Sequence, residues 1–243
     1  MQIRNFIPNL ITLLNLVSGS ISIILAFSGA MTLASWFIIL AVIFDFLDGM
    51  AARLLHAKSD IGAQLDSLAD VVSFGLAPSA IMYLLLLQSP GLPGWSAGVN
   101  RLLPFVALLV LVCGAFRLAK FNTDSTQADG FKGLPIPSTG LFVAALPLIL
   151  DQYSETGELA KFILNHYTLL AIVIFLSWLM VSNIPMIALK FKNLKWRDNS
   201  LQFILIGFAL VLFIFFRFSA IPMIILLYII ISLTSLSRKV DHR

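Results

Sequence analysis

Residues Asp45 to Asp70 read DFLDGMAARLLHAKSDIGAQLDSLAD, and the rest of the sequence is best interpreted around this stretch. Four of its carboxylates form two pairs: Asp45 and Asp48 are three residues apart, and Asp66 and Asp70 are four apart. Asp60 does not fit this spacing. Residues three or four apart lie on one face of a helix. Two neighbouring helices would therefore bring four negative charges to one place.

Four bare carboxylates in one place would repel one another, and divalent cations would relieve that repulsion. Hard oxygen ligands of this kind suit magnesium, manganese or calcium. Two such ions about 4 Å apart can clamp a phosphoryl group, and a nearby carboxylate can take a proton from an attacking hydroxyl. The alternatives are an ion-pair network with Arg53, Lys58 and Arg117, or a proton relay such as a cation or proton transporter uses.

The composition is that of a membrane protein: 59% of the 243 residues are hydrophobic and 12% are charged, against about 25% charged in soluble domains. A carboxylate costs about 2.5–3.5 kcal/mol at the centre of a membrane helix, so this acidic cluster calls for a function. The single cysteine, Cys113, excludes a disulfide framework. The three scattered histidines do not form a zinc motif with it.

Long apolar runs predict an all-α, polytopic transmembrane bundle that forms one domain over residues 1–243. The first run is too long and too polar in places for a cleaved signal peptide, so we expect it to be an uncleaved helix. About eight spans are predicted, at residues 8–28, 31–55, 66–88, 101–121, 137–151, 161–187, 200–217 and 219–236.

The basic residues predict the orientation of the bundle. With both termini in the cytoplasm, thirteen of the sixteen Lys and Arg residues fall on the inner side, leaving only Arg101, Lys161 and Arg217. This bias follows the positive-inside rule and places the acidic stretch at the cytoplasmic face. The basic loop from Leu189 to Asn199 carries interleaved aromatic residues and, between two spans, predicts a contact with anionic lipid rather than nucleic acid.

The acidic stretch also carries a recognisable motif. Its pattern is Asp45-x-x-Asp48-Gly49-x-x-Ala52-Arg53, eight residues, then Gly62-x-x-x-Asp66-x-x-x-Asp70. It matches the complete signature of the CDP-alcohol phosphotransferases, and the chain resembles that family. Within the family, residues 7–140 most resemble the membrane-integral (type II) phosphatidylserine synthases. This likeness rests on Ile7–Asn15, Leu65–Gly75, Ala77-Pro78, Cys113–Asn122 and Gly133–Pro137.

The resemblance implies a reaction in phospholipid biosynthesis. CDP-diacylglycerol would donate its phosphatidyl group to the hydroxyl of L-serine, releasing CMP, with two Mg²⁺ or Mn²⁺ ions as cofactors. It implies that Asp45, Asp48 and Asp66 bind the ions, and that Asp70 completes the metal shell and acts as general base. The nucleotide and its phosphates would lie against Gly49, Ala52, Arg53, Ser59 and Gly62.

The residues that would bind serine lie outside the signature. The candidates are Arg117 and Asn122 near the end of the fourth predicted span, Ser73 one turn after Asp70, and Asn15 in the first span. A sister enzyme using glycerol 3-phosphate or an inositol phosphate remains an alternative, as does archaetidylserine synthesis. The resemblance further implies a homodimer with a six-helix core, so that the C-terminal helices would be an addition to that core.

Overall fold

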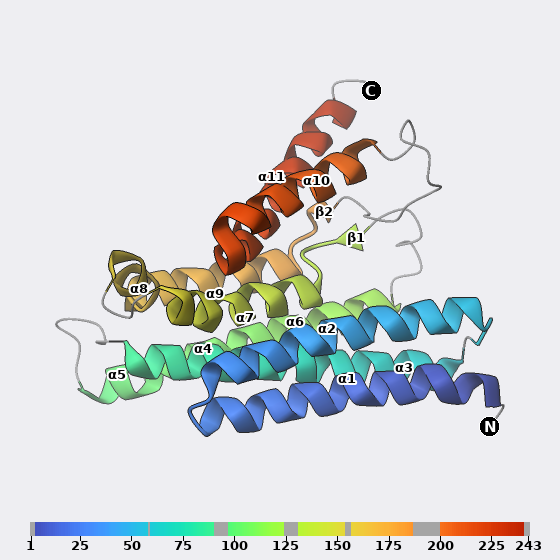
Figure 1. Ribbon diagram of the computed structural model, residues 1–243, viewed down its shortest axis with the longest axis horizontal. Coiled ribbons are helices and arrows are strands. Elements are labelled where there is room, and N and C mark those ends of the chain that lie inside the picture. The colour runs from blue at the N-terminus through green and yellow to red at the C-terminus, as the bar shows by residue number, and fades with distance from the viewer. Residues whose placement is uncertain are drawn as a thin grey trace.

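The computed structural model describes residues 3–57, 59–89, 97–123, 131–153, 157–186 and 200–240. Nearly all of its regular structure is helical, as predicted (Figure 1). The α-helices are α1 (Ile3–Phe27), α2 (Met31–Leu54), α3 (Asp60–Asp70), α4 (Ala77–Gln88), α5 (Ala97–Leu102), α6 (Leu108–Thr123), α7 (Ile136–Gln152), α8 (Glu158–Ile163), α9 (His166–Val181), α10 (Ser200–Phe216) and α11 (Ala220–Val240).

Within the described ranges, three short segments with π-helical or 3₁₀ hydrogen bonding join some of these α-helices end to end. They are the π-helical turn η1 (Val71–Leu76) between α3 and α4, and the 3₁₀ turns η2 (Leu103–Ala107) and η5 (Arg217–Ser219). Consequently α3, η1 and α4 form one continuous helical run, and so do α5, η2 and α6.

All eight predicted ranges contain helix, but they differ in length. Five helical segments are long and apolar enough to cross a membrane: Phe6–Phe27, Met31–Leu54, Asp60–Gln88, Ala97–Thr123 and Gly207–Leu233. The helices Ile136–Gln152 and His166–Val181 are apolar but shorter. The chain is therefore an integral membrane protein, with helices of unequal length in place of eight similar spans.

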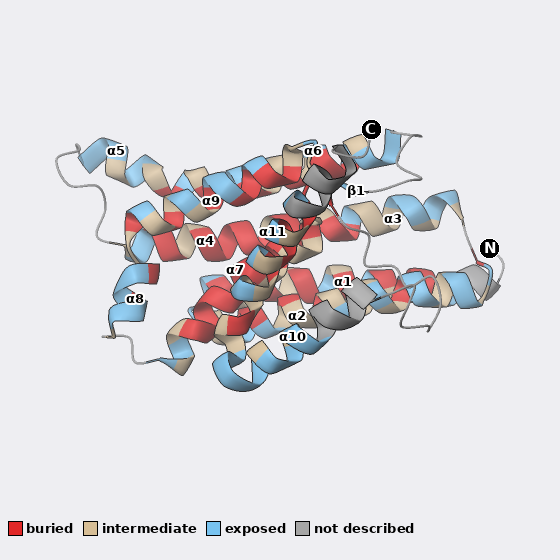
Figure 2. Cartoon of the chain, turned by 90° about the horizontal axis from the view of Figure 1, so that it is seen from above, coloured by how far each residue is buried: buried red, intermediate tan, exposed pale blue. Residues whose placement is uncertain are grey.

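The predicted seventh and eighth spans belong to one apolar segment that turns back on itself. At Arg217 the backbone φ is +48°, and α10 and α11 pack against each other as a hairpin (Figure 1). The large side chains of α10 described from Gly207 onward are almost all exposed, as expected for a helix that faces lipid (Figure 2).

The core lies around α7, which packs against α2, α4, η1 and α11. Eleven residues of this helix are buried, including its internal proline, Pro147. Its shortness fits this central position, because neighbouring helices rather than lipid surround it (Figure 2).

A two-stranded antiparallel pair, which the apolar periodicity does not predict, follows α6 and α9. Strand β1 (Phe131–Lys132) pairs with β2 (Pro185–Met186). Directly after β1, Gly133 has a φ of +74° and donates its N–H to the carbonyl of Ile184 at 2.8 Å, while Leu134 N–H donates to the Leu179 carbonyl at 3.0 Å. These bonds satisfy carbonyls at and just beyond the C-terminal end of α9.

Six of the thirteen Lys and Arg residues that predict the membrane orientation lie outside the described ranges. The basic loop Leu189–Asn199 lies there, as do Lys58 and Arg243. The contact of this loop with anionic lipid and the cytoplasmic position of both termini therefore remain predictions.

Candidate active site

Three of the four predicted carboxylates meet between α2 and α3. One oxygen each from Asp45, Asp48 and Asp66 lie within 4.8 Å of one another. The two helices are brought together by a short connection in which His56 takes a left-handed φ of +51°. Helical spacing thus groups Asp45 with Asp48, and the turn adds Asp66. The structure therefore brings together three of the four aspartates that the sequence predicts to converge.

Asp70 lies one turn beyond Asp66 and deeper in the protein, with 7% of its surface exposed. It does not belong to the 4.8 Å cluster, but it is near enough to Asp45 and Asp66 for their charges to repel its own. Its Oδ1 accepts a hydrogen bond of 3.4 Å from Nδ2 of Asn15 on α1. Asp70 therefore has one carboxylate oxygen engaged by a neutral donor and stands beside the cluster.

The cluster fits a divalent cation. Asp48 Oδ2 and Asp66 Oδ1 are buried and have no hydrogen-bond partner among the residues described. Buried oxygens of this kind normally have a partner, and a cation would supply one while cancelling the repulsion between the carboxylates. Oxygen ligands that converge in this way suit magnesium or manganese.

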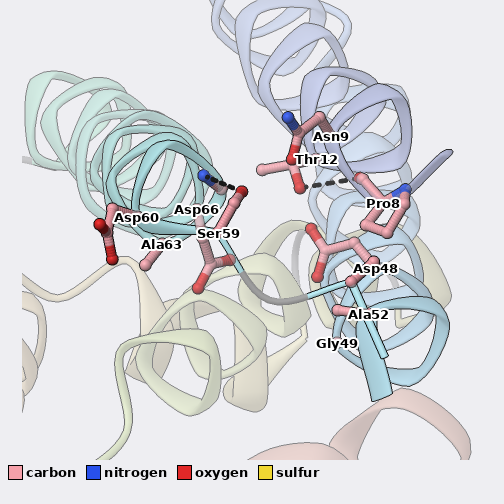
Figure 3. Close-up of a pocket in the computed structure, with 12 residues that line it drawn as sticks. Pro8, Asn9, Thr12, Asp48, Gly49, Ala52, Ser59, Asp60, Ala63 and Asp66 are labelled. Carbon is pink, nitrogen blue, oxygen red and sulfur yellow. Dashed lines mark hydrogen bonds between the residues drawn. The ribbon is translucent and has the colours of Figure 1, made fainter. Parts of the chain in front are cut away.

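A cavity of about 450 Å³ opens beside the cluster, and Asp48 and Asp66 face it from opposite sides (Figure 3). Four of the five residues predicted to contact the nucleotide line it: Gly49, Ala52, Ser59 and Gly62. A Cβ atom added to Gly49 would meet nothing within 4 Å, so this backbone is open to a ligand. Ser59 caps α3 by accepting a hydrogen bond of 3.1 Å from Gly62 N–H.

Arg53 is the exception among these five residues. It is exposed, and its Nε donates to the carbonyl of Gly49 at 2.9 Å. The side chain does not line the cavity. The guanidinium of Arg53, which was predicted to bind phosphate, is therefore hydrogen-bonded to its own helix α2 and lies outside the cavity lining.

Helix α1 supplies a wall of the cavity to which sequence reasoning gave no role. Pro8, Asn9 and Thr12 line it, and Asn9 and Thr12 are 7% and 4% exposed (Figure 3). The Thr12 hydroxyl donates to the Pro8 carbonyl at 3.0 Å, whereas Asn9 Nδ2 has no hydrogen-bond partner among the described residues. The spacing of Pro8, Asn9 and Thr12, which puts them on one helical face, is the signal that could have indicated this wall.

Three of the four candidate serine-binding residues gather near Asp70. Asn15 and Ser73 are fully buried, and Ser73 Oγ donates to the Asn15 carbonyl at 2.9 Å. Arg117 is 9% exposed, and its charge interacts with that of Asp70. Its Nε and Asn15 Oδ1 are buried atoms for which the described part of the chain provides no hydrogen-bond partner.

Asn122 lies apart from this group. It is exposed at the end of α6, where its Nδ2 donates to Ser67 Oγ on α3 at 2.8 Å. This hydrogen bond joins α6 to the helix that carries Asp66 and Asp70.

Comparison with known proteins agrees with this arrangement. The family model for CDP-alcohol phosphatidyltransferase matches residues 5–215. The chain is 36% identical over 207 residues to a CDP-diacylglycerol–serine O-phosphatidyltransferase of Helicobacter pylori, which covers 84% of this chain and 80% of that protein. It is 38% identical over 146 residues to the enzyme of the same name from Bacillus subtilis, covering 58% of this chain and 75% of that protein.

An archaeal relative carries a different name. The chain is 36% identical over 178 residues to the archaetidylserine synthase of Methanothermobacter thermautotrophicus, covering 70% of each protein. The family match extends across both acidic helices and the cavity beside them. This membrane bundle brings Asp45, Asp48 and Asp66 together beside the cavity, and the family model matches most of its length, so the chain belongs to the CDP-alcohol phosphatidyltransferase family.

Proposed function

We propose that this protein is a phosphatidylserine synthase, which transfers the phosphatidyl group of CDP-diacylglycerol to the hydroxyl of L-serine and releases CMP. The observation that carries the proposal is the acidic cluster of Asp45, Asp48 and Asp66 at the edge of the 450 Å³ cavity. The names of the bacterial relatives, which specify CDP-diacylglycerol and serine, support the choice of substrates.

The cavity would take the CDP part of the donor. Gly49 and Ala52 leave room for the nucleotide to lie against the α2 backbone. Asn9, whose Nδ2 has no hydrogen-bond partner among the described residues, and Ser59 offer polar contacts from the facing walls. Arg53 would reach the phosphates only after exchanging its bond to the Gly49 carbonyl for one to the ligand.

Two divalent ions, Mg²⁺ or Mn²⁺, would be held by Asp45, Asp48 and Asp66, with Asp70 completing the shell. When bound, they would polarise the pyrophosphate and neutralise the charge that develops on the CMP leaving group. The contribution of the chain is to hold the acidic residues at a fixed separation on two rigid helices, so that a phosphoryl group is positioned before reaction.

Asp70 would act as the general base. The serine hydroxyl oxygen forms a new bond to the phosphorus of the phosphatidyl group, and the bond from that phosphorus to the CMP oxygen breaks. The hydroxyl proton passes to a carboxylate oxygen of Asp70. Because Asn15 Nδ2 already donates to Oδ1, we expect the proton to go to Oδ2.

The buried groups beside Asp70 suit a zwitterionic acceptor. Arg117 Nε is a donor without a partner, and Asn15 Oδ1 is an acceptor without one, among the atoms described. Serine requires both, because its carboxylate accepts hydrogen bonds and its ammonium donates them. Ser73, which is fully buried, would line this subsite. Asn122 is exposed and lies apart from it, bonded to Ser67, so its contact with serine stays a prediction.

The site would open to the cytoplasm, where CDP-linked precursors and serine are present, in the cell membrane. The protein would act as a homodimer, with the basic loop Leu189–Asn199 drawn to anionic lipid. A cation or proton transporter is less well supported, because the four aspartates lie on the consecutive helices α2 and α3 and three of them cluster, whereas a transporter would spread them across the bundle.

The test is acceptor choice by the purified protein. Given CDP-diacylglycerol and Mg²⁺ or Mn²⁺, it should release CMP with L-serine and not with glycerol 3-phosphate or an inositol phosphate. CMP release with one of the phosphorylated alcohols instead would assign it to a sister activity. Replacing the diacylglycerol donor with CDP-archaeol distinguishes archaetidylserine synthesis, the activity named for the archaeal relative.

A further inference from the structure

The helix that carries Asp66 and Asp70 changes its form immediately after Asp70. Residues Val71–Leu76 make a π-helical turn, in which each hydrogen bond closes over one more residue than in an α-helix. Such turns are uncommon in helices and frequently mark functional sites. Ser73 is fully buried within this turn. The feature that needs explaining is a widened turn directly beside a proposed catalytic group.

Helix α1 lies against this turn at very short range. A Cβ atom added to Gly19 would lie 2.5 Å from Ser73 Cα and 2.4 Å from Ser73 Oγ, closer than real Cβ contacts. Only glycine fits the backbone approach observed here. One helical turn earlier on α1, the Asn15 carbonyl accepts the Ser73 hydroxyl bond of 2.9 Å. Gly19 and Ser73 therefore fix where Asn15 stands relative to η1.

Asn15 links this packing to the carboxylate. Its backbone carbonyl is held by Ser73, and its side-chain Nδ2 donates to Asp70 Oδ1 at 3.4 Å. Two hydrogen bonds thus join Asp70 to Asn15 and Asn15 to Ser73, and the backbone of η1 connects Ser73 back to Asp70. Together they form a closed ring. All three residues are at least nine-tenths buried, and water therefore has little access to replace a lost bond.

We propose that Gly19 and Ser73 are positioning residues: they seat α1 on the π-helical turn so that Asn15 holds the Asp70 carboxylate in its reactive orientation. This inference rests on the proposed role of Asp70 as general base. The hydrogen bond from Asn15 is already near the long limit for such bonds. A displacement of α1 by a few tenths of an ångström would therefore release Asp70.

The experiment compares Ser73→Ala and Gly19→Ala with two matched controls. Ser22→Ala removes another fully buried serine on α1, whose Oγ donates to the Ala34 carbonyl at 2.8 Å. Gly207→Ala adds a Cβ to a helical glycine that has nothing within 4 Å. The rate of CMP release is divided by the number of CDP-diacylglycerol sites measured by equilibrium binding, so that inactive protein does not lower the apparent kcat.

We expect Ser73→Ala and Gly19→Ala to lower kcat per site by about 10–100-fold, the loss typical of a misplaced reacting group. KM for CDP-diacylglycerol should stay unchanged, because neither residue lines the cavity. The two controls should retain the parental kcat per site. Ser73→Ala removes only the hydroxyl oxygen and cannot clash with its neighbours. It therefore tests the proposal by itself if Gly19→Ala fails to fold.

The outcomes separate this inference from the proposed function. If Ser73→Ala matches Ser22→Ala in kcat per site while Asp70→Asn is inactive, the positioning role is wrong and the role of Asp70 stands. If Asp70→Asn turns over at the parental rate, the proposed general base is wrong and the positioning role falls with it. Loss of kcat per site in Ser73→Ala, with inactive Asp70→Asn and normal controls, supports both.

Discussion

Asp48 and Asp66 face each other across one cavity although they come from different helices (Figure 3). Each has a buried carboxylate oxygen that no described residue engages by a hydrogen bond. One carboxylate oxygen of each, together with one of Asp45, lies within 4.8 Å of the others. In a membrane bundle this arrangement would be costly without a cation.

Asp48→Asn should raise the concentration of Mg²⁺ or Mn²⁺ needed for half-maximal CMP release by about 10–100-fold. The substitution keeps the shape of the side chain and removes the charge that attracts the ion. The measurement is a metal titration after treatment with a chelator, which should itself stop the parental enzyme. Asp151→Asn, on an exposed carboxylate at the end of α7, is the control and should titrate like the parent. Turnover that survives chelation would remove the metal from the mechanism.

Asp70→Asn should lower transfer to serine by about 10²–10⁴-fold, the usual contribution of general base catalysis. Asparagine preserves the volume of this buried position but cannot accept the hydroxyl proton. Binding of CDP-diacylglycerol should remain measurable, because Asp70 lies outside the cavity lining. Single-turnover CMP release measures the loss of transfer, and equilibrium binding of CDP-diacylglycerol measures the retained affinity for the donor. A variant that loses binding as well as transfer would show that Asp70 serves mainly to hold the metal–nucleotide complex.

The parts of this site that could be predicted from sequence depend on local geometry. Asp45 and Asp48 share one face of their helix, and Asp66 and Asp70 share one face of theirs. Their spacing alone ensures this, however the two helices pack. The apolar runs specify helices because the membrane leaves the backbone little alternative. The glycine and alanine positions in the signature line the cavity, and their contact with the nucleotide stays a prediction.

Other features depend on packing between distant segments and could not be predicted in this way. The place of Asn9 and Thr12 in the cavity wall is set by how α1 lies across α2 and α3. The π-helical turn after Asp70 has no marker in hydrophobic periodicity. Arg53 has the right residue type for a phosphate contact, yet a bond to its own helix at Gly49 determines its direction.

Gly49→Ala should raise KM for CDP-diacylglycerol by about 10-fold, because one added methyl group occupies space that the nucleotide would use. Its thermal unfolding midpoint should not fall, because no described atom lies within 4 Å of the new Cβ and alanine is the better helix former. Steady-state kinetics with a varied donor and thermal unfolding in detergent measure the two effects. Gly207→Ala shares the helical position and the open surroundings but lies away from the cavity, so it should leave KM unchanged and should not lower the midpoint. An unchanged KM in Gly49→Ala would place the nucleotide elsewhere.

Gly133→Ala should destabilise the fold more than Gly29→Ala does. Both glycines have positive φ, +74° and +87°, which costs an L-residue about 1–2 kcal/mol. At Gly29 the new Cβ would meet nothing within 4 Å, whereas at Gly133 it would lie 2.5 Å from the Met180 carbonyl oxygen. The clash would push the Gly133 turn away from the end of α9. Thermal unfolding of the two variants gives the comparison, and equal shifts would contradict the close packing of this turn.

Arg117→Met should raise KM for serine by about 10–100-fold, the loss expected when a charged donor to a buried carboxylate is removed. Methionine keeps much of the length and apolar bulk of the arginine stem, so the packing of α6 should survive. KM for CDP-diacylglycerol should not change, because Arg117 does not line the donor cavity. Arg101→Met, on an exposed arginine of α5, is the matched control and should behave as the parent. Arg117→Met could instead lower kcat at saturating serine and leave KM for serine unchanged. That result would mean that the guanidinium acts on Asp70, with which it interacts electrostatically, and that another group holds the serine carboxylate.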